Sequence, residues 1–136
     1  MGYAPYVGEL IDAYDLVSVA VEAGQTIYVT YTKTNAQTGE VYSGRASGIG
    51  TPEEVVDRRD ATPHHKNSEG FGPAVLDKAT TDPQAARGRE QLLIEKHGSA
   101  RSAGGTSGNA INGISSRNQK KATYIKKAIE WFGKVF

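Results

Sequence analysis

The feature that most constrains the fold is a pair of strand-like segments joined by a short polar turn. Apolar and aromatic side chains alternate with other residues along residues 26–33, as in a half-buried strand. Residues 35–39 (NAQTG) have the composition of a turn, and residues 40–45 resemble a second strand. The pattern predicts an antiparallel hairpin. The side chains expected on one face of its first strand are Ile27, Val29 and Tyr31, with Tyr28 and Thr30 on the other.

A capped helix is predicted soon after this hairpin. Thr51 can accept a hydrogen bond at the helix start, Pro52 fits the first turn, and Glu54 completes a capping box. Pro63 disfavours helical geometry in the residue before it, so the helix should end at or before Thr62.

Periodicity and stop signals predict three more helices, over residues 8–24, 82–98 and about 119–132. Residues 63–82 have little periodicity and are expected to form a loop, with at most a short strand or turn at residues 73–77. Glycine and serine make residues 98–116 a second expected loop. The apolar face expected for the last helix consists of Tyr124, Ala128, Ile129 and Phe132.

These elements predict an α/β or α+β domain: a small three-stranded antiparallel sheet flanked by helices. With 136 residues, the chain has the length of one domain. We divide it into a helical N-terminal extension (1–25), a core (26–118) and a basic C-terminal helix (119–136).

The composition excludes several classes of site. Because the chain has no cysteine, disulfides, thiolate zinc sites and cysteine nucleophiles are excluded. We find no signal-peptide pattern and no apolar run long enough to span a bilayer, so no membrane association is expected. Export would then depend on a larger parent protein or a dedicated secretion machine.

Charge is distributed unevenly along the chain. Residues 1–32 contain four acidic residues and no lysine or arginine, whereas residues 117–136 contain six basic residues and one acidic residue. A basic end of this kind can bind a polyanion, or it can simply solvate the outer face of a helix. The lysines we expect to contact nucleic acid are Lys120, Lys121 and Lys127.

Glu90 is the most informative single position. At 100° per residue, four residues of its helix with apolar or aromatic character lie within about 60° of it around the axis. They are Ala86, Leu93, Ile94 and His97. The carboxylate should therefore point inward, where an unpaired charge is costly. It is expected either to pair with an arginine (Arg45, Arg58 or Arg59) or to bind a divalent cation.

Two further features could carry chemistry. Arg59 shares the inward face of its helix with Val55 and Val56, so it could hold a phosphate or pair with an acid. His64 and His65 follow in a polar loop, where one of them could act as a general acid or base, or both could lie on the surface without a role.

The order of these features resembles the GIY-YIG nuclease superfamily, in particular its bacterial toxin branch at the C-termini of Rhs-type and related polymorphic effectors. The segment TIYVTYTKTNAQTGEVYSGRASG is similar to the paired-tyrosine hairpin of that family. GREQLLIEKHG is similar to its glutamate helix, and GNAINGISSRN to the asparagine-bearing stretch that follows. The likeness covers about residues 26–120.

The chain departs from the family pattern at several positions. The first motif is either Thr26-Ile27-Tyr28 or Val29-Thr30-Tyr31, and Ser43 stands where the second motif usually has an aliphatic residue. Pro63 separates the arginine and the histidine, which often share a helix in the family. The positions left open are Arg58 or Arg59, His64 or His65, and Asn109, Asn112 or Asn118, of which we favour Arg59, His65 and Asn112.

The resemblance implies a metal-dependent endonuclease. Glu90 would bind one Mg²⁺ or Mn²⁺ ion, and Tyr42 or its hairpin partner Tyr28 or Tyr31 would position or deprotonate the attacking water. Arg59, together with Arg45, would neutralise charge on the phosphate. The implied substrate is DNA, with RNA as the alternative.

The same resemblance implies a biological setting. The chain would be the toxin domain of a larger effector or delivery protein, secreted and acting in the cytoplasm of a target cell in interbacterial competition. A cognate immunity protein would be its partner.

The sequence also allows two other interpretations. One is an HNH-like ββα-metal nuclease built around the two adjacent histidines and Asn112. The other is a non-catalytic nucleic-acid-binding domain in which Glu90 only forms a salt bridge.

Overall fold

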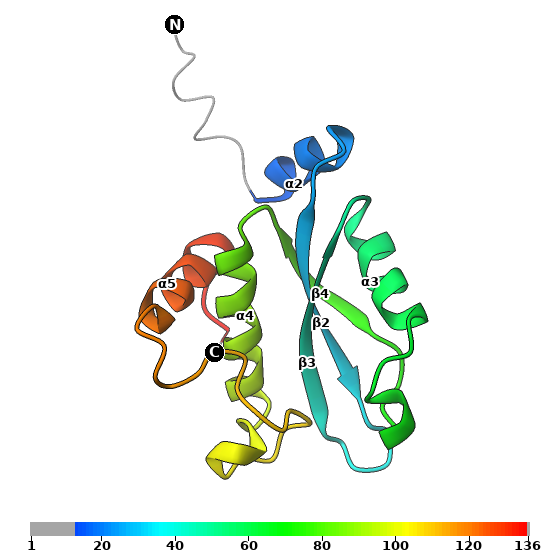
Figure 1. Cartoon of the computed structure of the whole chain (residues 1–136), viewed down its shortest axis with the longest axis vertical. Coiled ribbons are helices and arrows are strands. Elements are labelled where there is room, and N and C mark those ends of the chain that lie inside the picture. Colours follow the sequence, from blue (N-terminus) through cyan, green and yellow to red (C-terminus); the bar gives the residue numbers. More distant parts are fainter. Residues whose placement is uncertain (1–12, 136) are drawn as a thin grey trace, which may run out of the picture.

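The structure, a computed structural model, describes residues 13–135 as a three-stranded antiparallel sheet with helices on both faces (Figure 1). The central strand β2 (Ile27–Thr34) lies between β3 (Val41–Gly48) and β4 (Val75–Thr80). The helices are α2 (Ala13–Glu22), α3 (Pro52–Ala61), α4 (Pro83–Lys96) and α5 (Lys121–Phe132), with short 3₁₀ turns at Asn67–Glu69 and Arg101–Ala103. The predicted α+β class and three-stranded sheet are confirmed.

The hairpin predicted from the tyrosine-rich segment joins β2 to β3. Tyr31 lies opposite Gly44 and Lys33 opposite Tyr42, so these four residues share one face of the sheet. Asn35 accepts hydrogen bonds from two backbone N–H groups of the turn through its side-chain oxygen. The second strand is longer than the expected residues 40–45, because pairing with β2 continues to its end.

The edge strand β4 corrects the expectation that residues 63–82 are mostly a loop, since the short strand or turn considered at residues 73–77 is a strand that continues to Thr80. It pairs with β2 on one side, and an irregularity in the register lies between Thr30 and Tyr31. Its side chains do not alternate cleanly between buried and exposed, since Val75 and Lys78 are exposed and the residues between them are half-buried. A strand of this kind has little period-2 signal, and only tertiary pairing reveals it.

The start and end of α3 were predicted correctly from its capping residues and Pro63. The Thr51 side chain accepts from the backbone N–H of Glu54, and the Glu54 carboxylate accepts from the N–H of Thr51. Thr62 caps the other end just before Pro63. The first predicted helix also exists as α2, although its part before residue 13 lies outside the described residues.

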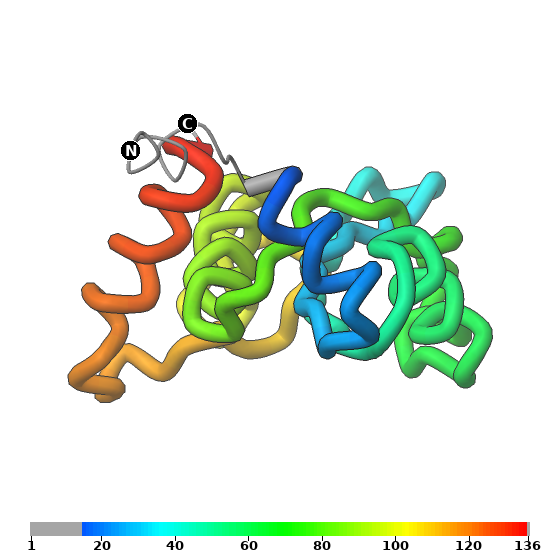
Figure 2. The backbone as a smooth tube through the Cα atoms, turned by 90° about the horizontal axis from the view of Figure 1, so that it is seen from above, coloured from blue at the N-terminus to red at the C-terminus, as the bar shows by residue number. Residues whose placement is uncertain are grey.

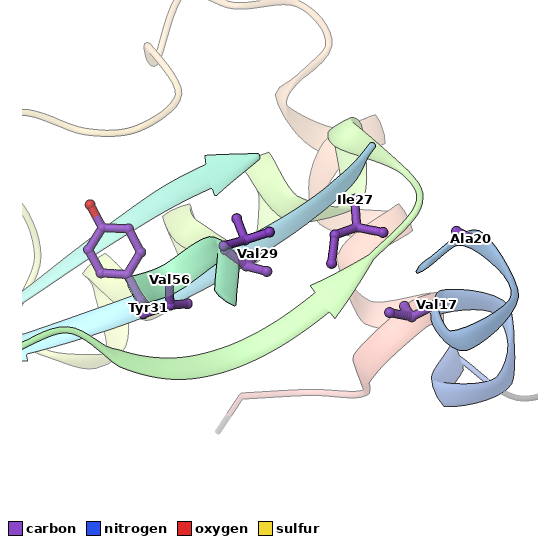
Figure 3. Close-up of a cluster of buried hydrophobic side chains, with 7 residues drawn as sticks. Val17, Ala20, Ile27, Val29, Tyr31 and Val56 are labelled. Atoms are coloured by element: carbon purple, nitrogen blue, oxygen red, sulfur yellow. The ribbon is translucent and has the colours of Figure 1, made fainter. Parts of the chain in front are cut away.

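The core lies between one face of the sheet and the pair α2 and α3. Figures 1 and 2 show α3 on the side away from α4 and α5, and α2 near one end of the strands. Figure 3 shows β2 side chains reaching toward those of both helices, and the Tyr31 hydroxyl pointing beyond the cluster. Each fully buried aliphatic side chain contributes roughly 1.5–3 kcal/mol. The core residues are Val17, Ala20, Ile27, Val29, Tyr31, Val55 and Val56.

Helix α5 packs outside α4 as an additional layer (Figure 2). A Cβ at Gly88 of α4 would lie 2.0 Å from the Tyr124 carbonyl oxygen, so the two helices approach more closely than a side chain would allow. Tyr124 and Ala128 are buried as predicted, but Ile129 is 36% exposed. The prediction that Ile129 belongs to the buried face was wrong because α5 buries only a narrow stripe, which includes Tyr124 and Ala128, mainly against α4. None of the described helices is long and apolar enough to cross a bilayer.

Candidate active site

A pocket of about 380 Å³ brings together six of the predicted catalytic residues. It lies at edge strand β3 and also draws residues from β2, α3 and α4. The predicted residues that line it are Tyr28, Tyr31, Tyr42, Arg45, Arg59 and Glu90.

The hairpin places Tyr31 and Tyr42 side by side at this pocket. Their ring centroids are 6.4 Å apart, with the ring planes inclined by 44°. The Tyr31 ring crosses the neighbouring strand at Gly44, where an added Cβ would lie 2.5 Å from the Tyr31 Cζ. Of the two tyrosines considered in the first strand, Tyr31 is therefore the one whose ring lies beside that of Tyr42. Tyr28 lines the same pocket but leaves β2 on the opposite face.

The Tyr31 hydroxyl is held by His64. The Tyr31 oxygen and His64 Nε2 are 2.9 Å apart, and His64 Nδ1 accepts from the backbone N–H of Lys66 at 3.1 Å. Because Nδ1 is an acceptor, the proton of the neutral ring is assigned to Nε2, which then donates to the Tyr31 oxygen. Burial, together with the positive charge of Arg59, lowers the pKa of His64 to about 4. His64 is thus neutral at physiological pH.

His65, the histidine favoured from the sequence, lies on the solvent side of His64. It is exposed and stacks on the His64 ring with centroids 4.7 Å apart. Its ring centroid is 5.5 Å from that of Tyr42. The structure brings His64, rather than His65, to the tyrosine hydroxyl. No local sequence feature separates the two histidines, because both lie between Pro63 and Lys66.

The two adjacent arginines of α3 have different surroundings. Arg59 lines the pocket, and its charge acts on the pKa values of both Tyr31 and Tyr42. Arg58 instead donates from Nη2 to the carbonyl of Ile49 in the turn between β3 and α3. The predicted choice of Arg59 agrees with this placement.

Tyr31 and Tyr42 are poor bases in this environment. Burial raises the pKa of Tyr31, and the nearby Tyr42 and Glu90 raise it further, against an opposing effect of Arg59. Burial also raises the pKa of Tyr42, with Glu90 adding to the rise while Arg59 and Arg45 oppose it. Both hydroxyls therefore keep their protons at neutral pH and can donate hydrogen bonds to an anionic ligand.

Glu90 points inward, as its helical position predicts, and is 8% exposed. Its Oε1 accepts from Arg45 Nε at 2.9 Å, so Arg45 is the partner among the three arginines considered. Burial raises the pKa of the Glu90 carboxyl, while the charges of Arg45 and then Arg87 lower it. A Cβ at Gly113 would lie 2.4 Å from Oε1, so this loop residue rests directly against the carboxylate.

The pocket offers one carboxylate that suits Mg²⁺ or Mn²⁺. Glu90 offers a hard carboxylate in a partly desolvated pocket, which suits such a cation. Among residues 13–135 there is no group of three or more His, Asp or Glu side chains that could surround a metal. Glu90 would therefore be the sole carboxylate ligand, with water and substrate oxygens completing the coordination, as is common for Mg²⁺.

The three candidate asparagines have separate positions. Asn109 is 5% exposed and binds both backbone groups of Ser43, accepting from its N–H and donating to its carbonyl, each at 2.9 Å. It thereby fastens the loop after α4 to β3 beside Tyr42. Asn112, favoured on sequence, accepts from Gln91 Nε2 at 3.0 Å and is not among the residues that line the pocket. Asn118 accepts from the N–H of Lys120 near the start of α5.

The lysines predicted to bind nucleic acid mainly face α4. Lys121 Nζ is 3.7 Å from Glu95 Oε2, and Lys127 Nζ is 3.6 Å from Asp82 Oδ2. Lys120 is exposed. Partly exposed pairs of this kind contribute little energy but reduce the charge that α5 offers to a polyanion.

A buried ion pair supports the histidine side of the pocket and was not predicted. Lys33 is fully buried, and its Nζ is 2.6 Å from Asp60 Oδ1, while Asp60 Oδ2 accepts from the N–H of Ala74. The hydrogen bond from Lys33 is the main influence that lowers the pKa of Asp60. Lys33 lies two residues after Tyr31 in β2, so the alternation of a strand places both side chains on the same face. This alternation is the sequence signal that could have predicted an inward Lys33.

Comparison of the chain with protein-family models, with curated proteins and with solved structures finds no match in any of the three.

Proposed function

We propose that this chain is a metal-dependent phosphodiester hydrolase, most specifically an endonuclease that cuts DNA without reading its sequence. The observation that carries the proposal is the convergence of Tyr31, Tyr42, Arg59 and the inward carboxylate of Glu90 on one pocket. Hydroxyl donors, a guanidinium and a hard carboxylate are the groups that phosphodiester hydrolysis uses to bind and neutralise the reacting phosphate.

The roles of the residues follow from their surroundings. Arg59 supplies positive charge to the phosphate, and Arg45 adds to it while it orients the Glu90 carboxylate. Tyr31 accepts from His64, which leaves its own proton free to be donated to a phosphate oxygen or to the attacking water. The raised pKa values of both tyrosines favour positioning of water over proton abstraction. A Mg²⁺ or Mn²⁺ ion at Glu90 would supply Lewis-acid stabilisation of the leaving oxyanion.

The biological role belongs to the same proposal. We place the chain as the toxin domain of a secreted effector that acts in the cytoplasm of a target cell. A larger delivery protein and a cognate immunity protein would be its partners. The support is the resemblance in the order of motifs to the GIY-YIG toxin branch, together with the Val29-Thr30-Tyr31 and Tyr42-Ser43-Gly44 segments, which lie on adjacent strands of the hairpin with Tyr31 opposite Gly44.

The HNH-like alternative has weaker support. His64 and His65 follow α3, whereas that alternative needs its ligands on a hairpin followed at once by a helix. His64 is already engaged by Tyr31 and by the backbone of Lys66.

The test is to incubate the purified chain with supercoiled plasmid and with total RNA, each with Mg²⁺ and with chelator. We expect nicking of plasmid that needs the metal and that falls by at least 100-fold in Glu90→Gln, in line with the loss of one transition-state contact. Glu130→Gln, on the outer surface of α5, is the matched control.

Three results would each overturn a different part of the proposal. Folded protein without any nuclease activity would favour the non-catalytic nucleic-acid-binding reading. Unchanged activity in Glu90→Gln would remove the metal assignment, and cleavage of RNA alone would change the substrate to RNA.

A further inference from the structure

We propose that Arg87 binds a second phosphate of the substrate strand, next to the phosphate held at the Glu90 pocket. This inference rests on the proposed nuclease function and extends it. It defines the substrate as a strand with at least two consecutive phosphates, in preference to an isolated phosphodiester.

Arg87 is close to the reacting pocket but is not part of its lining. It precedes Glu90 on α4 by three residues, so the two side chains lie on neighbouring parts of the helix surface. The positive charge of Arg87 lowers the pKa of the Glu90 carboxyl, which is consistent with this proximity. A phosphate on Arg87 would therefore be adjacent to one bound at Glu90.

The Arg87 guanidinium is held in place while part of it stays free. Its Nε contacts the Gly113 carbonyl at 3.5 Å, and its Cζ lies 5.2 Å from the centroid of the buried Tyr124 ring. Within residues 13–135, neither terminal nitrogen of Arg87 has a hydrogen-bond partner. Two free donors on a planar group that is already oriented match the geometry of a phosphate.

Gly113 links this arginine to the carboxylate. Its carbonyl contacts Arg87, and its Cα lies so close to Glu90 that an added Cβ would be 2.4 Å from Oε1. Gln91 secures this stretch of the loop by accepting from the N–H of Ile114 and donating to Asn112. The distance between Arg87 and Glu90 is thus set by one well-held loop residue. Such preorganisation lowers the entropic cost of binding two groups at once.

The local charge supports two phosphates. Arg45 and Arg87 both act on the Glu90 carboxylate, and Arg59 lines the same pocket. Arg45 forms the ion pair with Glu90, whereas Arg59 and Arg87 form no ion pair with an acidic side chain among residues 13–135. By contrast, Lys121 and Lys127 on α5 face acidic groups of α4 and its cap. We therefore assign the phosphate contact beside the pocket to Arg87 and not to the α5 lysines.

The first measurement is binding of a fluorescently labelled ten-nucleotide single strand, by anisotropy and in chelator so that no cleavage occurs. We expect Arg87→Gln to weaken binding about tenfold, the effect of one charged contact. The slope of log affinity against log salt should become shallower by about 0.7 for a single strand. Arg58→Gln removes the same charge from a side chain bonded to the Ile49 carbonyl, and we expect it to bind like the unaltered chain.

The second measurement compares hydrolysis of an oligonucleotide with that of bis(4-nitrophenyl) phosphate, which has one phosphodiester. For Arg87→Gln we expect kcat/KM to fall about tenfold more on the oligonucleotide than on the small diester. Equal losses on both substrates would mean that Arg87 acts only through Glu90, and would overturn the inference.

The two proposals can fail separately. If the unaltered chain hydrolyses neither substrate, the nuclease proposal fails, while anisotropy still reports whether Arg87 binds phosphate. If the unaltered chain and Arg87→Gln bind the oligonucleotide equally well, the assignment of Arg87 is overturned even when cleavage is normal. The same holds if neither protein binds it. Circular dichroism of each variant checks that the fold survives.

Discussion

The ring of Tyr31 lies against the backbone of Gly44 in the neighbouring strand, at a position where any side chain would collide with it. This contact lets a tyrosine rooted in the core carry its hydroxyl across β3 to the pocket that holds Glu90. The glycine of the Tyr-x-Gly segment thus has a steric function, and the first prediction follows from it.

Replacement of Gly44 by alanine should displace Tyr31. The new Cβ would lie 2.5 Å from the Tyr31 Cζ, so either the ring or the strand must move. We expect a loss of about 1–3 kcal/mol in the free energy of unfolding, as for other overpacked sites, together with loss of most nuclease activity. Urea denaturation and plasmid nicking measure the two effects.

Gly72→Ala is the control for this prediction. A Cβ there meets the Thr34 carbonyl oxygen at an acceptable 3.4 Å. If Gly44→Ala were as stable and as active as Gly72→Ala, the steric role of Gly44 would be wrong.

Neutralising Glu90 should make the pocket tyrosines easier to ionise. The carboxylate charge raises the pKa values of Tyr31 and Tyr42, so Glu90→Gln should lower both. The measurement is tyrosinate absorbance during alkaline titration, in which the latest-titrating tyrosines should ionise at lower pH. Glu130→Gln should give the curve of the unaltered chain, and an unchanged curve for Glu90→Gln would place the carboxylate away from both rings.

Breaking the pair between Lys33 and Asp60 should destabilise the fold strongly. Asp60→Asn leaves the fully buried Lys33 ammonium without its anion, and such a loss costs about 3 kcal/mol. The double variant Lys33→Met with Asp60→Leu removes both charges and should recover most of that loss. Urea denaturation of the unaltered chain, Lys33→Met, Asp60→Leu and the double variant forms a double-mutant cycle, and full additivity of the single effects would contradict a coupled pair.

His64 should make folding stability depend on pH in the acidic range. Its pKa is about 4 in the folded protein, below the ordinary value of 6.5, so the unfolded chain binds more protons between these values. Stability should therefore fall as pH decreases from about 6.5 to 4, by at most about 1.4 kcal/mol per pH unit for one proton. His64→Gln should flatten this part of the profile.

His65→Gln is the matched substitution for that experiment, because its ring is exposed and stacks on His64. Chemical denaturation at several pH values measures the slope. If the slope were the same in His64→Gln as in the unaltered chain, the burial of a neutral His64 would be refuted.

Local sequence signals predicted much of the fold. The capping box of Thr51 and Glu54 and the stop at Pro63 bound α3 correctly, because these effects act within one turn of helix. The alternation in β2 placed Ile27, Val29 and Tyr31 on the core face. Helical spacing also predicted that Glu90 points inward.

Other features needed tertiary structure. Strand β4 is held by its neighbour and has an irregular burial pattern, so its own residues indicated only a short strand or turn at residues 73–77 and not its extent to Thr80. Ile129 was expected on the buried face, but α5 packs mainly against α4 and leaves this side chain partly exposed. The arginine that pairs with Glu90 is 45 residues away in the chain, and no local rule selects it from three candidates.

By itself, the sequence determined the local elements: the hairpin, the capped helices and the inward direction of one carboxylate. Those depend on interactions between residues a few positions apart, which the order of amino acids specifies directly. Only the tertiary structure decided that Tyr31 pairs with Tyr42, that His64 rather than His65 meets the hydroxyl, and that Gly113 rests on Glu90. These are contacts between distant segments, set by how the elements pack together.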